Sequence, residues 1–174
     1  MKGATAVEAI LERRSIRQYT EQPIPEEMFT ELLEAGMCAP SAGNERPWHF
    51  IVITERSLLE GITEIHEHSK MLKQAPAAII VCADLTRNIY PGVNYWIQDC
   101  AAATENILLA AQDKGLGTCW LGVYPREERM AGMRRLLELP EHIVPFAAVA
   151  VGYPDEIKSA GSRYDATRVH RNGW

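Results

Sequence analysis

The pattern of hydrophobic and polar positions predicts alternating helices and strands along the chain. Apolar residues recur at three- and four-residue spacing in several segments that begin and end with residues typical of helix ends. We predict helices over about 5–13, 25–38, 57–73, 94–114 and 126–138. Short β-branched or continuous apolar runs predict strands at about 49–54, 77–83, 118–123 and 145–152. Because helices and strands alternate, the fold class is α/β or α+β.

Two segments differ from this regular pattern. The predicted helix at 94–114 is rich in alanine and stops at Gly115, so it can approach another backbone closely. Residues 154–174 are polar, contain several arginines and show no hydrophobic periodicity. A tail of this kind either extends freely or wraps around another surface.

Composition narrows the possible functions. The chain has 174 residues, of which 47% are hydrophobic, which suits one domain with its own core. Its formal net charge of -5 argues against a general affinity for nucleic acid or anionic lipid. No apolar run approaches the roughly 18 residues that span a bilayer, so we expect a soluble cytoplasmic protein. The four cysteines lack metal-ligand spacing, and we expect reduced, mostly buried thiols and no metal site.

A cluster of cations follows the first predicted helix. Arg13, Arg14 and Arg17 lie within five positions and surround Ser15. One interpretation is a solvated face whose cations favour the helix dipole. The other is a phosphate site, because guanidinium and hydroxyl donors together suit a phosphate dianion. The chain contains neither a GxGxxG fingerprint nor a GxxxxGK[ST] loop, so a dinucleotide or P-loop motif does not explain such a site.

Several motifs together resemble the FMN-dependent nitroreductase family. They are RRSIRQY at 13–19, PIP at 23–25, APSAGNERPWHF at 39–50, GLGTCWLG at 115–122 and VGYP at 151–154. They occur in the family's order and cover nearly the whole chain. The resemblance implies a three-layer α+β fold, with a mixed, mostly antiparallel sheet flanked by helices, in an intertwined homodimer. It implies one FMN-binding domain over 1–174, in which 154–174 is an arm that contacts the partner subunit.

The resemblance also implies a set of cofactor-binding residues. The phosphate and ribityl chain of FMN are assigned to Arg13, Arg14, Ser15, Arg17 and Arg163. The loop that reaches the flavin from the partner subunit is assigned to Pro40, Ser41 and Asn44, and the strand end beside the ring to Leu121, Gly122 and Val123. The backbone N–H of Gly122 is expected to donate to flavin N5. No catalytic acid or base is assigned, because the flavin itself carries the redox chemistry.

The implied function is an FMN-dependent oxidoreductase. It takes a hydride from NADH or NADPH and reduces a nitroaromatic, a quinone or a similar small acceptor by a ping-pong mechanism. Flavin fragmentation and reductive dehalogenation are alternatives within the superfamily. A flavin carrier or redox sensor without turnover is an alternative from another class, and so is a regulatory domain whose arginines bind a phosphorylated metabolite.

A few positions depart from the family pattern or have no assigned role. Arg46 stands where the family usually has glutamine, and Gly161 stands where larger members carry a lysine, so we expect Arg14 to replace that charge. His66 and His68 are predicted to be exposed rather than metal ligands. Trp48 and Trp120 are predicted core residues, while Asp99 with Gln98 is either a buried polar pair or part of a solvated stripe.

Overall fold

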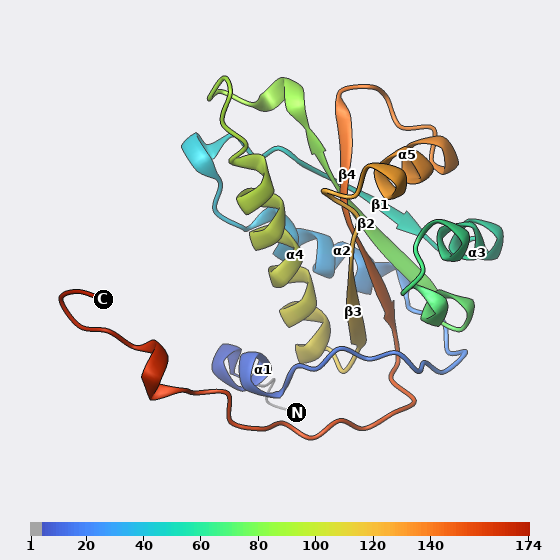
Figure 1. Ribbon diagram of the computed structural model, residues 1–174. Coiled ribbons are helices and arrows are strands. Elements are labelled where there is room, and N and C mark those ends of the chain that lie inside the picture. The colour runs from blue at the N-terminus through green and yellow to red at the C-terminus, as the bar shows by residue number, and fades with distance from the viewer. Residues whose placement is uncertain (1–4) are drawn as a thin grey trace.

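The computed structural model describes residues 5–174. Residues 1–4 of the predicted domain lie outside the described part. The helices are α1 (Ala6–Glu12), α2 (Glu26–Met37), α3 (Arg56–Ile65), α4 (Trp96–Asp113) and α5 (Glu127–Leu136). The strands are β1 (Trp48–Ile53), β2 (Ala77–Asp84), β3 (Gly117–Gly122) and β4 (Ile143–Gly152). Figure 1 shows how they are arranged. Every predicted strand is present within two residues of its predicted ends.

The predicted helix at 57–73 is wrong in its second half. Helix α3 ends at Ile65, His66 is extended, and a separate 3-10 helix covers Lys70–Lys73. The hydroxyl of Ser69 donates to the carbonyl oxygens of Ile62 and His66 at 3.3 and 2.6 Å. The Ile62 carbonyl also accepts the last helical bond from the His66 N–H at 3.0 Å, and the His66 carbonyl accepts from the Ser69 N–H at 2.9 Å, so a turn replaces the next helical bonds. The periodic pattern therefore spans two short helices joined by a turn.

The first helix begins as the sequence predicts. The hydroxyl of Thr5 accepts from the backbone N–H of Glu8 at 3.3 Å, and the Glu8 carboxylate accepts from the Thr5 N–H at 2.6 Å. This reciprocal capping box satisfies two donors at the start of α1.

The end of the longest helix, α4, is also predicted by its sequence. Gly115 follows it and adopts φ +74, a left-handed conformation that favours glycine. Helix α4 therefore stops where its sequence indicates.

The four strands form one sheet in the order β1-β2-β4-β3, and all three pairings are antiparallel. The predicted mostly antiparallel sheet is confirmed. The central strands β2 and β4 are buried along most of their length, which explains their continuous apolar runs. A register shift between Val81 and Cys82 interrupts the pairing of β2 with β4.

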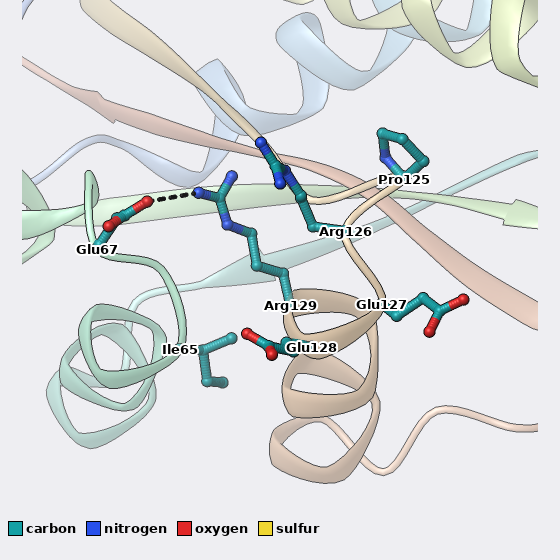
Figure 2. A pocket seen from close by; sticks show the side chains of 7 residues that line it. All are labelled: Ile65, Glu67, Pro125, Arg126, Glu127, Glu128 and Arg129. Atoms are coloured by element: carbon teal, nitrogen blue, oxygen red, sulfur yellow. Dashed lines mark hydrogen bonds and ion pairs between the residues drawn. The ribbon is translucent and has the colours of Figure 1, made fainter.

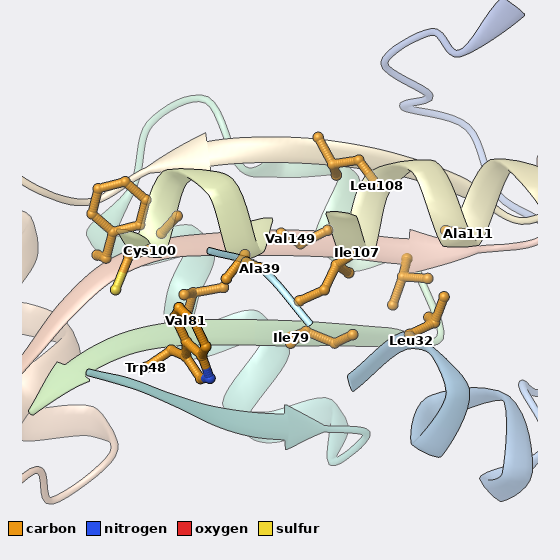
Figure 3. Close-up of a cluster of buried hydrophobic side chains, with 14 of the residues drawn as sticks. Leu32, Ala39, Trp48, Ile79, Val81, Cys100, Ile107, Leu108, Ala111 and Val149 are labelled. Carbon is orange, nitrogen blue, oxygen red and sulfur yellow. The ribbon is translucent and has the colours of Figure 1, made fainter. Parts of the chain in front are cut away.

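Helices cover both faces of the sheet, so the predicted three-layer arrangement is confirmed (Figure 1). On one face, α2 and α4 pack against alternate residues of β2, including Ile79 and Val81 (Figure 3). On the other face, α3 and α5 cover the alternate set of β2 residues, including Ile80 and Cys82. Successive side chains of a strand point to opposite faces, so one strand contributes to two cores.

The predicted burial of the cysteines and tryptophans is confirmed. Cys82, Cys100 and Cys119 are buried, all four cysteines are unpaired, and burial raises the pKa of the Cys82 thiol to about 12. Trp48 is buried, and the half-buried Trp120 packs against the same core. None of the helices within residues 5–174 is both long enough and apolar enough to cross a membrane.

The chain beyond β4 first follows the N-terminal loop and then leaves the domain. Tyr19 forms a bridge with Pro154, and the Asp155 N–H donates to the Gln18 carbonyl at 2.9 Å. Figure 1 shows the rest of the tail running past α1 and away from the sheet. Trp174 at its end is fully exposed. The first part of the tail is therefore fixed to the domain, and the second part projects from it.

Candidate functional site

One side of β3 is an open sheet edge that the N-terminal loop partly covers. Ser15 forms a parallel bridge with Thr118, and the Ile16 N–H donates to the Thr118 carbonyl at 2.9 Å. On the other side, the Val123 N–H donates to the Phe146 carbonyl of β4 at 3.1 Å. Because backbone groups alternate in direction along a strand, Thr118 and every second residue after it point away from β4.

Gly122, at the end of β3, follows this alternation and directs both its N–H and its carbonyl off the sheet edge. The residue is exposed, and a side-chain carbon added there would meet no atom within 4 Å. Its neighbours Leu121 and Val123 are both buried and fix the strand end. Gly122 therefore offers a backbone donor beside open space, as a flat ring lying against the strand would require.

Cations gather at the opposite end of this edge. Arg14, Lys158 and Arg163 line one cavity of about 640 Å³, which Gly161 also lines. The Lys158 ammonium donates to the Ser15 carbonyl at 2.7 Å. Arg14 and Arg163, two of the predicted phosphate ligands, therefore line the same cavity, and Lys158 adds a cation that was not predicted from the sequence. A lysine in an aperiodic tail carries no local signal of this contact.

The remaining predicted phosphate ligands lie beside this cavity in different settings. The Arg13 guanidinium is 3.7 Å from the Glu105 carboxylate of α4, whereas Arg17 is exposed and its guanidinium donates to the Ser15 carbonyl at 3.4 Å. The Arg17 backbone N–H donates to Glu156 at 2.5 Å, and this bond is the main cause that lowers the pKa of Glu156. The loop is thus held by the start of the tail.

The third predicted group forms a compact turn before β1. The Ser41 hydroxyl accepts from the Arg46 N–H at 3.0 Å, and the Asn44 side-chain oxygen accepts from the Arg46 guanidinium at 2.8 Å. Pro40 is exposed next to them. The unusual Arg46 therefore stabilises its own loop through Asn44 and keeps a cation at its surface.

This turn lies apart from the other two groups within one chain. The Ala42 N–H is bound by Asp99 in the first turn of α4, whereas α1 packs against the second half of that helix, where Leu109 and Asp113 lie. Within residues 5–174, no hydrogen bond or ion pair joins residues 40–44 to residues 13–17 or 121–123. A single chain therefore assembles the cationic end and the glycine end of the edge, but not the turn.

Comparisons with known proteins identify the family of this chain. The model of the nitroreductase family matches residues 10–69 and 64–153. The chain belongs to the nitroreductase family. A protein of Methanothermobacter thermautotrophicus, provisionally described as an NADH dehydrogenase/NAD(P)H nitroreductase, is 49% identical over 97% of this chain and 87% of its own length.

Solved structures place this nitroreductase among close structural neighbours. A Bacteroides thetaiotaomicron protein with the same provisional description is 40% identical, with a TM-score of 0.92 over 99% of this chain and 100% of that one. An FMN-dependent nitroreductase of Clostridium difficile R20291 is 30% identical, with a TM-score of 0.89 over 97% and 99% of the two chains. The family resemblance and the fold predicted from the motifs are confirmed.

A buried pair of carboxyl groups lies beneath the turn of this nitroreductase. Asp99 and Glu45 are both almost fully buried, and their side chains contact each other. One oxygen of Asp99 accepts from Ala42, one oxygen of Glu45 accepts from the Ile89 N–H at 3.0 Å, and the second oxygen of each has no other partner. Burial is the main cause that raises the pKa of Asp99. Gln98 is exposed, so the partner of Asp99 is Glu45 rather than its neighbour.

His66 corrects the prediction that both histidines are exposed. Its side chain is buried at 3% exposure, and its Nε2 lies 3.0 Å from the Gly122 carbonyl oxygen. Its Nδ1 accepts from the His68 backbone N–H at 3.2 Å. Burial, followed by the nearby Arg129 charge, lowers the pKa of His66. His68 itself is exposed as predicted. No sequence signal links a histidine to a glycine 56 residues away.

A second cavity of the nitroreductase adjoins this histidine. It measures about 680 Å³ and lies between the end of α3 and the start of α5. Figure 2 shows Arg129 extending toward Glu67, to which its guanidinium donates at 3.3 Å. The same guanidinium donates to the Gly122 carbonyl at 2.8 Å. The cavity wall and the end of β3 are therefore connected through one arginine.

Proposed function

We propose that this nitroreductase-family protein is an FMN-dependent oxidoreductase that takes a hydride from NADH or NADPH and reduces a small acceptor. The observation that carries the proposal is the edge of β3, which has a cationic cavity at one end and an open glycine at the other. The five residues from Thr118 to Gly122 span roughly 13 Å of extended strand, at about 3.3 Å for each of the four steps. A cofactor with a phosphate, a flexible chain and a flat ring suits an edge of this length and polarity.

The residues of this chain fit the phosphate end of FMN. Arg14, Lys158 and Arg163 supply positive charge around one cavity, and Arg13, Ser15 and Arg17 lie beside it. Guanidinium and ammonium groups bind phosphate oxygens through charge-assisted hydrogen bonds. Gly161 replaces a lysine of larger family members. Lys158 lines the same cavity and supplies a cation for the phosphate in its place.

The residues at the ring end supply orientation and electrostatics. Leu121, Gly122 and Val123 are proposed to lie beside the ring, with the Gly122 N–H as donor to it. Bound FMN supplies the chemistry, since it accepts a hydride and returns electrons as a hydride or singly. A fixed backbone donor stabilises charge that develops on the ring without an acid or base from the protein. We therefore assign no catalytic acid or base.

We also propose a homodimer with the cofactor at its interface. Pro40, Ser41 and Asn44 cannot join the rest of the site within one chain, since Asp99 holds their turn elsewhere on α4. A second copy can bring this turn to the glycine end. The projecting part of the tail supports the same arrangement, because it leaves its own domain and is free to cross to a partner (Figure 1).

Names of relatives support the reductant and the cofactor. The Methanothermobacter relative is described as acting with NAD(P)H, and the Clostridium neighbour as FMN-dependent. A ping-pong mechanism with a nitroaromatic, a quinone or a similar acceptor is proposed on the same grounds.

The visible spectrum of the purified protein tests the proposal. We expect flavin absorbance that bleaches when NADH or NADPH is added without oxygen and returns when an acceptor such as a quinone is added. Exchange of Arg14 for glutamine should raise the dissociation constant of FMN about tenfold, as expected when a charged hydrogen bond to phosphate is lost. The matched control is Arg126→Gln, which removes an exposed arginine outside the cationic cavity.

Two outcomes would contradict the enzyme. A colourless protein that does not take up added FMN would show that the cationic cavity binds another phosphate compound. A flavin that binds but is bleached by neither nucleotide would identify a flavin carrier or sensor instead.

A further inference from the structure

Two donors from different helices converge on one backbone oxygen at the end of β3. His66 follows the last residue of α3, and its Nε2–H donates to the Gly122 carbonyl over 3.0 Å. Arg129, in the first turn of α5, donates to the same oxygen over 2.8 Å. The Arg129 guanidinium is itself held by the Glu67 carboxylate at 3.3 Å. An exposed strand end is thus tied to both helices that cover one face of the sheet.

The protonation state of His66 follows from its partners. A carbonyl oxygen only accepts, so Nε2 carries the proton. Nδ1 faces the backbone N–H of His68 and must accept, so the ring is neutral. Both nitrogens are engaged with the backbone, and the side chain is buried. His66 therefore has no proton to deliver to a bound substrate, and its role is to hold another group.

The group that it holds needs such support. Gly122 has no side chain, and a side-chain carbon there would touch nothing, so hydrogen bonds rather than side-chain packing hold this residue. Its carbonyl and the Val123 N–H form one peptide unit, which is held by the two side-chain donors and by the Val123 bond to the Phe146 carbonyl at 3.1 Å. The Gly122 N–H belongs to the preceding peptide unit and leaves the same side of the strand, so the dihedral angles of Gly122 relate its direction to the held carbonyl.

We propose that His66 and Arg129 are positioning residues that hold the Gly122 backbone so that its N–H faces the flavin. This inference rests on the proposed function, because it assigns a purpose to residues behind the proposed ring-binding edge. It makes the electronic character of the flavin depend on a histidine and an arginine that do not touch it. A loosened Gly122 N–H stabilises the electron-rich reduced flavin less than a fixed one does.

Paired variants test the proposal. His66→Leu removes the donor, whereas His66→Gln retains a donor at a similar distance from the backbone. Arg129→Met removes the second donor. The matched controls are His142→Leu, an exposed histidine outside this cavity, and Arg126→Met, an arginine that lines the cavity. Neither side chain makes a hydrogen bond or ion pair in the described part of the chain.

Three measurements are made on each variant. The first is 15N relaxation at Gly122 in the flavin-free protein, which reports the anchor without any cofactor. The second is the dissociation constant of FMN, and the third is the two-electron midpoint potential of bound FMN. We expect faster backbone motion at Gly122 in His66→Leu and Arg129→Met. Loss of one hydrogen bond should weaken the binding of reduced FMN up to tenfold more than the binding of oxidised FMN. This difference lowers the midpoint potential by up to about 30 mV.

The controls and His66→Gln separate positioning from general stability. Wild-type behaviour of His66→Gln, His142→Leu and Arg126→Met, together with the shifts above, would support the proposal. If His66→Leu fails to fold, Arg129→Met alone must show increased motion and the lower potential. Unchanged Gly122 motion and an unchanged potential in Arg129→Met and in every folded His66 variant would overturn it. A wild-type protein that binds no FMN would instead refute the proposed function, while the relaxation data would still decide whether the anchor exists.

Discussion

Asp99 and Glu45 are two buried carboxyl groups beneath the 40–44 turn. Each accepts from one loop N–H and leaves its second oxygen without a hydrogen-bond donor. Burial first, and contact with the Glu45 carboxyl second, raise the pKa of Asp99 and favour its protonated form. Because Asp99 binds the Ala42 N–H, its protonation state is linked to the order of this turn.

Asp99→Asn is expected to stabilise the protein at neutral and alkaline pH. An amide keeps the oxygen that accepts from Ala42 and adds a donor for Glu45. Because the pKa of Asp99 is raised in the folded state, its contribution is present below its ordinary pKa and is lost as pH rises through the raised value. The variant removes this loss, and we expect the free energy of unfolding to rise by about 1 kcal/mol at pH 8.

Urea denaturation at pH 5 and pH 8 measures this effect. Asp113→Asn, which changes an exposed carboxylate on the same helix, is the matched control and should change little. A variant of Asp99 that is less stable than the wild type at pH 8 would show that the pair is not a repulsive contact.

Glu156→Gln is expected to weaken the junction between the tail and the N-terminal loop. The carboxylate accepts from the N–H groups of Arg17 and Gln18 and pairs with Lys158 at 3.0 Å. Its pKa is lowered in the folded state, so its contribution is present above its ordinary pKa of 4.5 and is lost as pH falls through the lowered value. The variant should lose about 0.5 kcal/mol at pH 7, with the difference vanishing in acid. Thermal unfolding across this pH range measures it, and a difference that grows in acid would contradict the argument.

At the scale of elements, helices α3 and α5 act as a rigid support for the end of β3. Their contact is close: a side-chain carbon added at Gly132 would lie 2.7 Å from the Ile65 side chain, and one at Gly61 would lie 2.8 Å from Leu136. Both glycines therefore allow the two helices to approach. Since His66 and Arg129 extend from these helices, the spacing of the pair sets the position of both donors.

Gly132→Ala is expected to push α3 and α5 apart. The added methyl group overlaps Ile65, and overpacking of this kind costs about 1–3 kcal/mol, more than the gain in helix propensity. Ile65→Ala creates room for it, so the double variant should be more stable than the sum of the two single changes predicts. Urea denaturation of the four proteins of this cycle measures the coupling, and simple additivity would show that the helices do not limit each other.

At the scale of the whole molecule, the tail has two parts with different roles. Residues 154–159 bind the N-terminal loop through Glu156, Lys158 and the Ser159 carbonyl, which accepts from Arg14 at 3.2 Å. Within the described chain, the hydrogen bonds of residues 160–174 are all internal to the tail. The first part supplies Lys158 to the cationic cavity, residues 161–163 add Arg163 to it, and the segment after them is free to contact a partner.

Two truncations distinguish these roles. Removal of residues 160–174 takes away Arg163 and the projecting part, so we expect weaker FMN binding and a less stable dimer in a folded domain. Removal of residues 154–174 also takes away Lys158 and Glu156, and should in addition destabilise the N-terminal loop. FMN titration, light scattering and thermal unfolding measure the three effects. Unchanged flavin retention and dimer mass after the longer truncation would contradict the assignment of the tail.

Features that depend on neighbours along the chain could be predicted without the structure. Hydrophobic period located the strands and most helices, and contiguous motifs identified the nitroreductase family and the Arg13 to Arg17 cluster. The error at 57–73 arose because a periodic pattern does not show the turn after Ile65, in which the Ser69 N–H and hydroxyl bind the His66 carbonyl. Local chemistry thus predicted the elements, the family and part of the candidate site.

Contacts between residues far apart in the sequence became known from the folded structure alone. Lys158 reaches the carbonyl of Ser15 across 143 residues, His66 reaches Gly122 across 56, and Asp99 meets Glu45 from another element. In each contact, the residues next to one partner in the sequence do not indicate the other partner. The packing of the elements in the fold sets the distance between the two. A lysine in a polar tail and a histidine after a helix therefore look like surface residues until the fold is known.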